Sequence, residues 1–263
     1  MGQTWDKLKR RREAKIKLAE VMVKADQVVV IHYSCESFYD RPDGSSPRIT
    51  SIAVRNLESG QTTSFSIHQV AERKGYSAIA LEQHYGELEK LMLDEFYEYV
   101  RLRNSYFWLH WNMRDINYGF PAIAHRHKVL KGKPEEIDDS KLVDLSRLLI
   151  AIYGNHYIPH PRLVQLIEKN LISNKDFLDG KAEAEAFEKK EYVKLHQSTL
   201  RKVDVISNIV ERAANNSIKT NSKTKDVYGD YLTAFAELIK ENPLISGVIA
   251  LIGLVSAVIS FFK

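Results

Sequence analysis

Cysteine is almost absent from the sequence of 263 residues, in which Cys35 is the single one. One cysteine cannot form an intramolecular disulfide, and such usage is typical of a reducing compartment, so we expect a cytoplasmic body. The first residues lack the apolar core of a secretory signal peptide, and Asp6 stands where a myristoylation motif needs Ser or Thr. Neither sign of charge dominates, because 38 basic and 34 acidic residues leave a net charge of +4. This small excess is compatible with nucleic acid or anionic lipid and identifies neither.

Charge is also missing from the segment Pro243 to Phe262, which reads PLISGVIALIGLVSAVISFF. In a helix that rises about 1.5 Å per residue, roughly 20 apolar residues can cross a bilayer. A buried soluble helix is the alternative, but such helices usually keep a polar stripe, and this segment offers only serines. The sequence therefore predicts one transmembrane helix at 243–262, which anchors the protein in the cell inner membrane with its body on the cytoplasmic side.

Small residues recur every three or four positions in this predicted span. They are Ser246, Ala250, Gly253, Ala257 and Ser260. This spacing places them on one side of a helix, where small residues let transmembrane helices approach closely and associate. A single uncharged span can line a pore only as a ring of several chains, so we expect a homo-oligomer, a tetramer or larger.

Three further segments are predicted outside the central part of the chain. Residues 1–26 predict a basic helix, residues 216–225 a polar linker, and residues 226–242 an amphipathic helix that leads into the span. The basic helix carries a run of four cations, Lys9, Arg10, Arg11 and Arg12. This run predicts contact with phosphate groups of nucleic acid or of lipid, and a solvated helix face is the alternative.

The central residues 27–215 predict one α/β domain. Apolar and β-branched runs predict strands at 28–33, 48–57, 62–67 and 105–110, with a hairpin turn at 58–61 in which Gly60 supplies the positive φ. Helical periodicity predicts helices at 80–103, 118–130, 139–153, 161–170 and 181–215.

This order of elements resembles a ribonuclease-H-like core, and within that group it resembles the DEDD 3′–5′ exonucleases of the proofreading type. The resemblance covers roughly residues 27–210 and implies a mixed sheet flanked by helices. In that family four carboxylates, beginning with an Asp-x-Glu on the first strand, hold two Mg²⁺ ions. Clustered carboxylates are required there because two metal ions must clamp the attacking and leaving oxygens.

The first motif falls on Ser34-Cys35-Glu36, so that Glu36 matches and Ser34 replaces the first Asp. The third motif, a His five residues before an Asp, falls on His196 and Arg201. There the Asp is replaced by an arginine, and the nearest aspartate is Asp204.

The second motif, His-Asn-x-x-Phe-Asp, falls on residues 110–115. His110 and Asp115 match, whereas Trp111 and Arg114 replace the Asn and the Phe. The alternative for Asp115, as for Glu36, is an ordinary residue at the end of a strand or the start of a helix.

These departures imply a domain that is not an enzyme and holds no metal or other cofactor. The loss of a shared metal ligand and an arginine that would repel a cation both disfavour two-metal catalysis. We expect the domain to bind single-stranded nucleic acid or an oligonucleotide through Tyr33, Ser34, Glu36, His110, Trp111, Arg114, Asp115, His196 and Arg201.

A soluble ligand-binding domain followed by a membrane span is similar in layout to the effectors of bacterial anti-phage systems, of which the Hailong effector type is an example. The sequence thus predicts a membrane effector whose domain controls an oligomeric pore. A membrane-tethered metal-dependent nuclease, with Asp40 or Asp204 as a substitute ligand, is the alternative. A tail-anchored scaffold without a ligand is a third reading.

Overall fold

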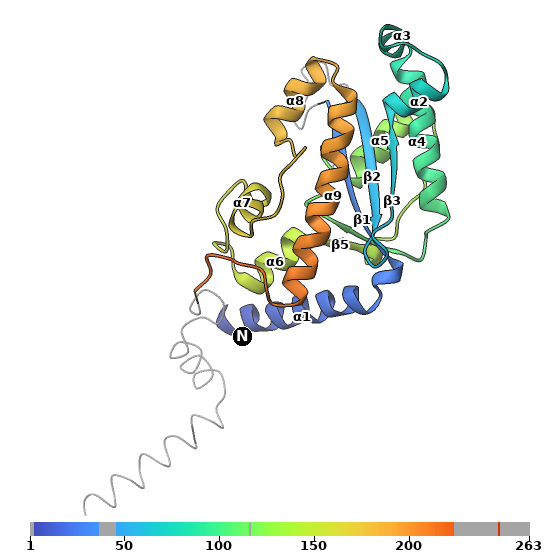
Figure 1. The fold of residues 1–263 in the computed structure, drawn as a ribbon. Coiled ribbons are helices and arrows are strands. Elements are labelled where there is room, and N and C mark those ends of the chain that lie inside the picture. Colours follow the sequence, from blue (N-terminus) through green and yellow to red (C-terminus); the bar gives the residue numbers. More distant parts are fainter. Residues whose placement is uncertain (1–2, 37–45, 116, 224–246, 248–263) are drawn as a thin grey trace, which may run out of the picture.

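The computed structural model describes residues 3–36, 46–115, 117–223 and residue 247 (Figure 1). The predicted amphipathic helix at 226–242 and, apart from Gly247, the predicted span at 243–262 lie outside these residues. Within the part of the chain that is described, no helix has both the length and the apolar character that crossing a membrane requires.

A mixed five-stranded sheet forms the centre of the body. Its strands are β1 (Val28–Cys35), β2 (Ile49–Asn56), β3 (Thr62–Ser66), β4 (Phe107–His110) and β5 (Leu142–Asp144), in the spatial order β3-β2-β1-β4-β5. The pairs β1–β2 and β2–β3 are antiparallel, and the pairs β1–β4 and β4–β5 are parallel. In this register Ile31 of β1 lies opposite Val54 on one side and His110 on the other.

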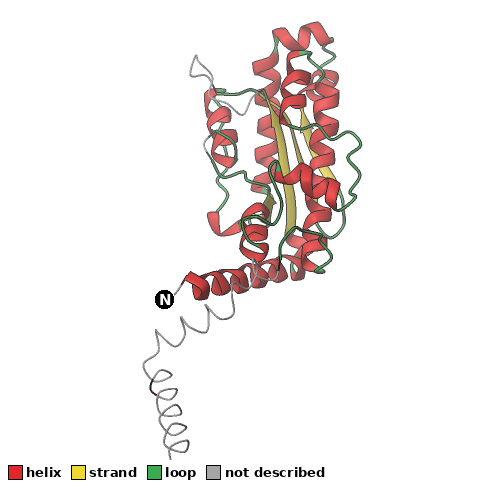
Figure 2. Cartoon of the chain, turned by 90° about the vertical axis from the view of Figure 1, so that its left-hand side faces the viewer, coloured by secondary structure: helices red, strands yellow, loops and turns green. Residues whose placement is uncertain are grey.

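Helices cover both faces of this sheet, as the two perpendicular views show (Figures 1 and 2). They are α1 (Gln3–Val23), α2 (Ile67–Arg73), α3 (Ala78–Gln83), α4 (Tyr85–Arg101), α5 (Phe120–Val129), α6 (Leu145–Tyr153), α7 (Arg162–Lys169), α8 (Gly180–Glu188) and α9 (Tyr192–Ala214). Two short 3-10 turns, Ala25–Gln27 and Asp139–Lys141, precede β1 and β5.

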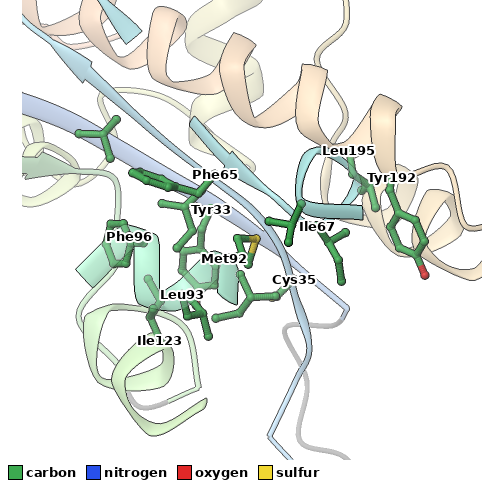
Figure 3. Close-up of a cluster of buried hydrophobic side chains, with 14 of the residues drawn as sticks. Tyr33, Cys35, Phe65, Ile67, Met92, Leu93, Phe96, Ile123, Tyr192 and Leu195 are labelled. Atoms are coloured by element: carbon green, nitrogen blue, oxygen red, sulfur yellow. The ribbon is translucent and has the colours of Figure 1, made fainter. Parts of the chain in front are cut away.

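The alternation of side chains along β1 divides the core into two parts. Val29 and Ile31 pack on the side of α4 and α5, in the cluster that Figure 3 shows around Phe96 and Met92. Val28 and Val30 face the other way and pack with apolar residues of α1, α6 and α9. All eight residues of β1 are buried, which is typical of a central strand with both faces covered.

The α/β class and the first four strands are confirmed, as is the hairpin turn, where Gly60 has φ 69°. The predicted helix at 139–153 is wrong in its first part, because Leu142, Val143 and Asp144 pair with β4 as the strand β5. A three-residue apolar segment carries too little periodicity to separate a strand from a helix, and pairing with β4 decides it.

Two predicted helices are each divided in the structure. The helix expected at 80–103 is divided at His84 into α3 and α4. The helix expected at 181–215 is divided into α8 and α9 by a turn in which Lys190 takes φ 60°, a left-handed conformation that ends a helix. This second division allows α8 to fold back against α9.

Residues 217–222, in the segment expected as a linker, are hydrogen-bonded to the body. Asn170, at the end of α7, accepts from the backbone N of Lys219 at 2.7 Å and donates to its carbonyl at 3.1 Å. The backbone N of Asn221 donates to the carbonyl of Tyr157 at 2.7 Å, and Ser222 Oγ donates to the carbonyl of Tyr153 at 2.6 Å. We call residues 217–222 the strap.

Replacing Asn170 with alanine should free the strap. Because the buried amide satisfies both backbone groups of Lys219, we expect Asn170→Ala to lower the free energy of unfolding by about 1–3 kcal/mol. It should also speed proteolysis after residue 216. Chemical denaturation and limited proteolysis measure both effects. Asn174→Ala, at an exposed asparagine of the following loop, is the control, and equal stability of the two variants would contradict the role of Asn170.

Candidate functional site

The face of the sheet that packs against α9 changes from apolar to polar at the carboxyl end of β1. Val28 and Val30 are followed on this face by His32 and Ser34, both buried. The antiparallel ladder with β2 is irregular there, since Ser34 lies opposite Ser51 but Cys35 lies opposite Ile49. Such bulges are frequent next to functional sites. The carboxyl ends of β1 and its parallel neighbour β4 also meet at this edge, the usual ligand position in open α/β sheets.

A network of buried hydroxyl groups joins β1 and β2 to α9. Ser34 Oγ lies 2.8 Å from Thr199 Oγ1, which in turn lies 2.6 Å from Ser51 Oγ. Ser34 Oγ also donates to Glu183 Oε1 of α8 at 2.8 Å. All four side chains are fully buried, so their polar groups are satisfied by one another instead of by solvent.

An ion pair completes this network, which we call the Ser34 network. Lys202 Nζ of α9 lies 2.7 Å from Glu183 Oε2, and the side chains are 6% and 1% exposed. Ser198 Oγ donates to Glu183 Oε1 at 3.2 Å. The pair therefore places an ammonium group beside the carboxyl end of β1.

His32 borders the Ser34 network. Burial, and then the charge of Lys202, hold the pKa of its imidazole well below the usual value, so the ring is neutral at physiological pH. Its Nδ1 lies 3.3 Å from the hydroxyl of Tyr118, and its Nε2 has no hydrogen-bond partner among the described residues. A neutral ring next to an ammonium group adds no positive charge to this edge.

Glu36, the matching carboxylate of the first motif, is bound to Arg48. The two carboxylate oxygens accept from Arg48 Nη2 at 2.9 Å and Nε at 3.2 Å, a bidentate geometry. The guanidinium is also held over the rings of Tyr85 and Phe187, at 4.8 and 4.7 Å from their centroids. A metal ion would have to compete with this arginine for Glu36.

The second motif forms the turn after β4. His110 Nδ1 accepts from the backbone N of Met113 at 3.0 Å. Burial lowers the pKa of His110 to about 4; the charge of Asp144 opposes this shift, and the smaller effect of Arg114 adds to it. Arg114 pairs with Asp144, at the end of β5. Trp111 is half-buried and packs on the α6 and α9 side of the core, while Asp115 is exposed and accepts from the backbone N of Asn117.

The third motif is divided between two environments. His196 is buried with its ring 5.0 Å from that of His68, and burial, with the second ring, lowers the pKa of His196 to about 4. Arg201 instead donates to the carbonyl of Lys175 at 2.8 Å and to Asp204 Oδ2 at 2.7 Å. The α9 side chains that meet Ser34 are thus Thr199 directly and Lys202 through Glu183.

Tyr33 faces away from the Ser34 network. Its hydroxyl accepts from the backbone N of Gly119 at 3.0 Å, and its ring stacks on Tyr118 with centroids 4.7 Å apart. Figure 3 shows Tyr33 within the apolar cluster on the α4 side of the sheet. Of the residues expected from the motifs, Ser34 alone joins the network directly.

Sequence reasoning missed Glu183, Thr199 and Lys202. The signal was present in α9, where a lysine lies seven positions after Leu195 and one before Val203, on the buried stripe of an amphipathic helix. A charged residue on such a stripe needs a buried partner, and nothing local identifies that partner as Glu183.

Among the described residues near this edge, four cations are each paired with a carboxylate. The pairs are Arg48–Glu36, Arg114–Asp144, Arg126–Glu89 and Lys202–Glu183. These four pairs therefore add no net charge to the edge. Over the described parts of the chain, no group of three or more His, Cys, Asp and Glu side chains is arranged to hold a metal ion.

The remaining predicted contacts lie elsewhere. Lys9, Arg10 and Arg12 are exposed on α1, and Arg11 is half-buried with its Nε donating to the carbonyl of Ile152 at 3.1 Å. The five small residues of the predicted span, Ser246, Ala250, Gly253, Ala257 and Ser260, lie outside the described residues.

Removing one partner of the buried ion pair should be costly. We expect Lys202→Met to lower the free energy of unfolding by about 3–5 kcal/mol, because it leaves the Glu183 carboxylate buried without its cation. The double variant Glu183→Gln/Lys202→Met should recover part of this loss. Denaturant unfolding of the single and double variants measures the coupling.

The exposed pair Lys181–Glu185, with side chains 87% and 56% exposed, provides the control. Lys181→Met should change stability by less than about 1 kcal/mol. Equal effects of Lys202→Met and Lys181→Met would mean that the buried pair is not a structural constraint.

Comparison of the chain with protein-family models, with curated proteins and with solved structures finds no match. The contacts and the exposed surfaces of this chain are therefore the only observations that bear on its function.

Proposed function

We propose that the chain is a membrane effector, acting in anti-phage defence, whose exonuclease-like body binds a single-stranded oligonucleotide without cutting it. Ligand binding to the body controls an oligomeric pore built from the segment 243–262. The fold supports the first part: the sheet is mixed, with antiparallel pairs on one side of β1 and parallel pairs on the other, and helices flank it, and a mixed sheet flanked by helices is what resemblance to the ribonuclease-H-like group implies.

The Ser34 network is the observation that carries the proposal of binding without cutting. Two-metal catalysis needs clustered carboxylates that neutralise two cations. In their place the carboxyl end of β1 offers the Ser34 hydroxyl, and the carboxylate to which this hydroxyl donates, that of Glu183, is already neutralised by Lys202. Glu36 is held by Arg48 in the same way. These contacts favour a structural role for carboxylates that a nuclease would use as ligands.

The turn after β4 supports the choice of ligand. Trp111 is half-buried, and its exposed part offers an aromatic surface on which a base can stack. Arg114 has 38% of its side chain exposed, so a phosphate can reach it in exchange for Asp144. Stacking combined with a guanidinium contact is how single strands are held without base-specific reading.

Full-length protein in detergent should bind a fluorescent single-stranded oligonucleotide and leave it intact with Mg²⁺ or Mn²⁺ present. Fluorescence anisotropy should show weaker binding at higher salt, because phosphate contacts release counterions. Arg114→Glu should weaken binding by about tenfold or more, since a charge-assisted contact contributes about 1.5–3 kcal/mol.

Arg101→Glu is the matched control, because Arg101 is also an exposed arginine paired with a carboxylate, Glu98. It should leave the affinity unchanged. If the protein degrades the oligonucleotide and Glu36→Gln abolishes this activity, the chain is a membrane-tethered nuclease instead. If the protein does not bind the oligonucleotide, the interpretation as a tail-anchored scaffold without a ligand remains.

The pore should depend on the small residues of the span. Gly253→Leu holds neighbouring helices apart, so it should reduce oligomers in detergent and abolish dye leakage from induced cells. Insertion should persist because leucine is at least as apolar as glycine. The control is Leu254→Ile, one position away, which should change neither property. Leakage equal to that of wild type in Gly253→Leu cells would show that the span is a plain anchor.

A further inference from the structure

We propose that the outward face of α1 is a docking surface for anionic phospholipid headgroups, by which the body rests on the membrane. This proposal rests on the proposed function, because it requires the membrane anchor at 243–262. It adds a lipid partner for α1, which is not part of the proposed oligonucleotide site. Four independent features of α1 carry it: its charge, its exposed face, its place on the body and its aliphatic residues.

The excess positive charge of the whole chain is concentrated in α1. This helix holds seven Lys and Arg residues against three acidic residues, an excess of four. The net charge of the complete chain is also +4, so the rest of the chain is balanced. Each basic residue near an anionic bilayer contributes about 1 kcal/mol of attraction, which falls off within a Debye length of about 10 Å.

The basic residues occupy the side of α1 that faces solvent. Ala14, Leu18 and Val21 point inward and belong to the apolar core with α6 and α9. Exposed cations on the helix are Lys9, Arg10, Arg12 and Lys15. The acidic residues cancel this charge only in part: Glu20 is paired with Lys17 and Lys24, and Asp6 and Glu13 offset two more of the seven cations of the helix.

Two large aliphatic side chains extend the same exposed stripe. Ile16 is 59% exposed and Val23 is 84% exposed. The successive spacings from Lys9 to Arg12, Ile16 and Val23 are three, four and seven positions, which places all four residues on one side of the helix. A helix that presents cations and exposed aliphatic residues together is suited to a membrane interface, where headgroups meet the former and acyl chains the latter. Contact with a nucleic acid backbone would use the cations and leave Ile16 and Val23 in water.

The strap also lies beside α1. Arg11 of α1 donates to the carbonyl of Ile152, and Ser222 of the strap donates to the next carbonyl, that of Tyr153. The described chain therefore ends next to the basic helix, which lies across one end of the body in Figures 1 and 2. Anchoring at 243–262 raises the effective concentration of bilayer near this end, so modest contacts of α1 suffice for docking.

A probe at position 16 tests the proposal in the full-length protein. Ile16→Cys is labelled with an environment-sensitive dye, while buried Cys35 stays unlabelled. The protein is reconstituted into nanodiscs of phosphatidylcholine alone or mixed with phosphatidylserine. Nitroxide lipids should quench the dye in the mixed discs, and Lys9→Glu/Arg12→Glu should lose this quenching. Ile79→Cys is the matched control: it is 75% exposed on α3, at the end of the body opposite α1 in Figure 1, and should show no quenching.

Two further measurements separate this inference from the proposed function. The first is whether Lys9→Glu/Arg12→Glu still co-purifies with the nanodiscs and binds the oligonucleotide with wild-type affinity. If it does, loss of quenching means that these basic residues of α1 contact lipid. A dye at position 16 that is not quenched in either disc overturns the inference while the anchor stands. The inference is also overturned if Lys9→Glu/Arg12→Glu leaves the dye signal unchanged but weakens oligonucleotide binding. In that case the basic face of α1 binds nucleic acid.

Discussion

The burial of β1 on both faces is the constraint on which the rest of the body depends. All eight of its residues are buried, so it can exist only between β2 and β4 with helices packed above and below. Its two sets of apolar side chains require two separate helical layers, one with α4 and α5 and one with α1, α6 and α9. The polar residues at the carboxyl end of β1 are buried in the same layers, so each of them needs a hydrogen-bond partner there.

The Ser34 network follows from that requirement. Ser34 carries no charge, and its hydroxyl is satisfied by Thr199 and Glu183 without any ion. Lys202 then neutralises Glu183 inside the protein. Buried pairs of this kind are weak contributors to stability but costly to break, so they fix the position of α8 relative to α9. The carboxyl end of β1 is therefore a structural junction at which β1, β2, α8 and α9 meet.

The two ends of the body then have different characters. At the carboxyl end of β1 and β4 the cations Arg48, Arg114 and Lys202 are paired with carboxylates. At the end covered by α1, basic residues face solvent beside the strap. This separation gives the proposed effector one end for its ligand and another for the membrane, and the sheet and α9 connect them.

Local pattern was enough to determine four of the five strands, the hairpin at Gly60 and the basic helix. These features depend on runs of neighbouring residues, whose apolar periodicity and turn chemistry act within a few positions. The tertiary structure alone decided β5, which is a strand because β4 offers it hydrogen bonds. It also decided the partner of Ser34, because Glu183 is 149 positions away in the chain. Contacts between distant residues are set by how the helices pack on the sheet, and no local pattern encodes that choice.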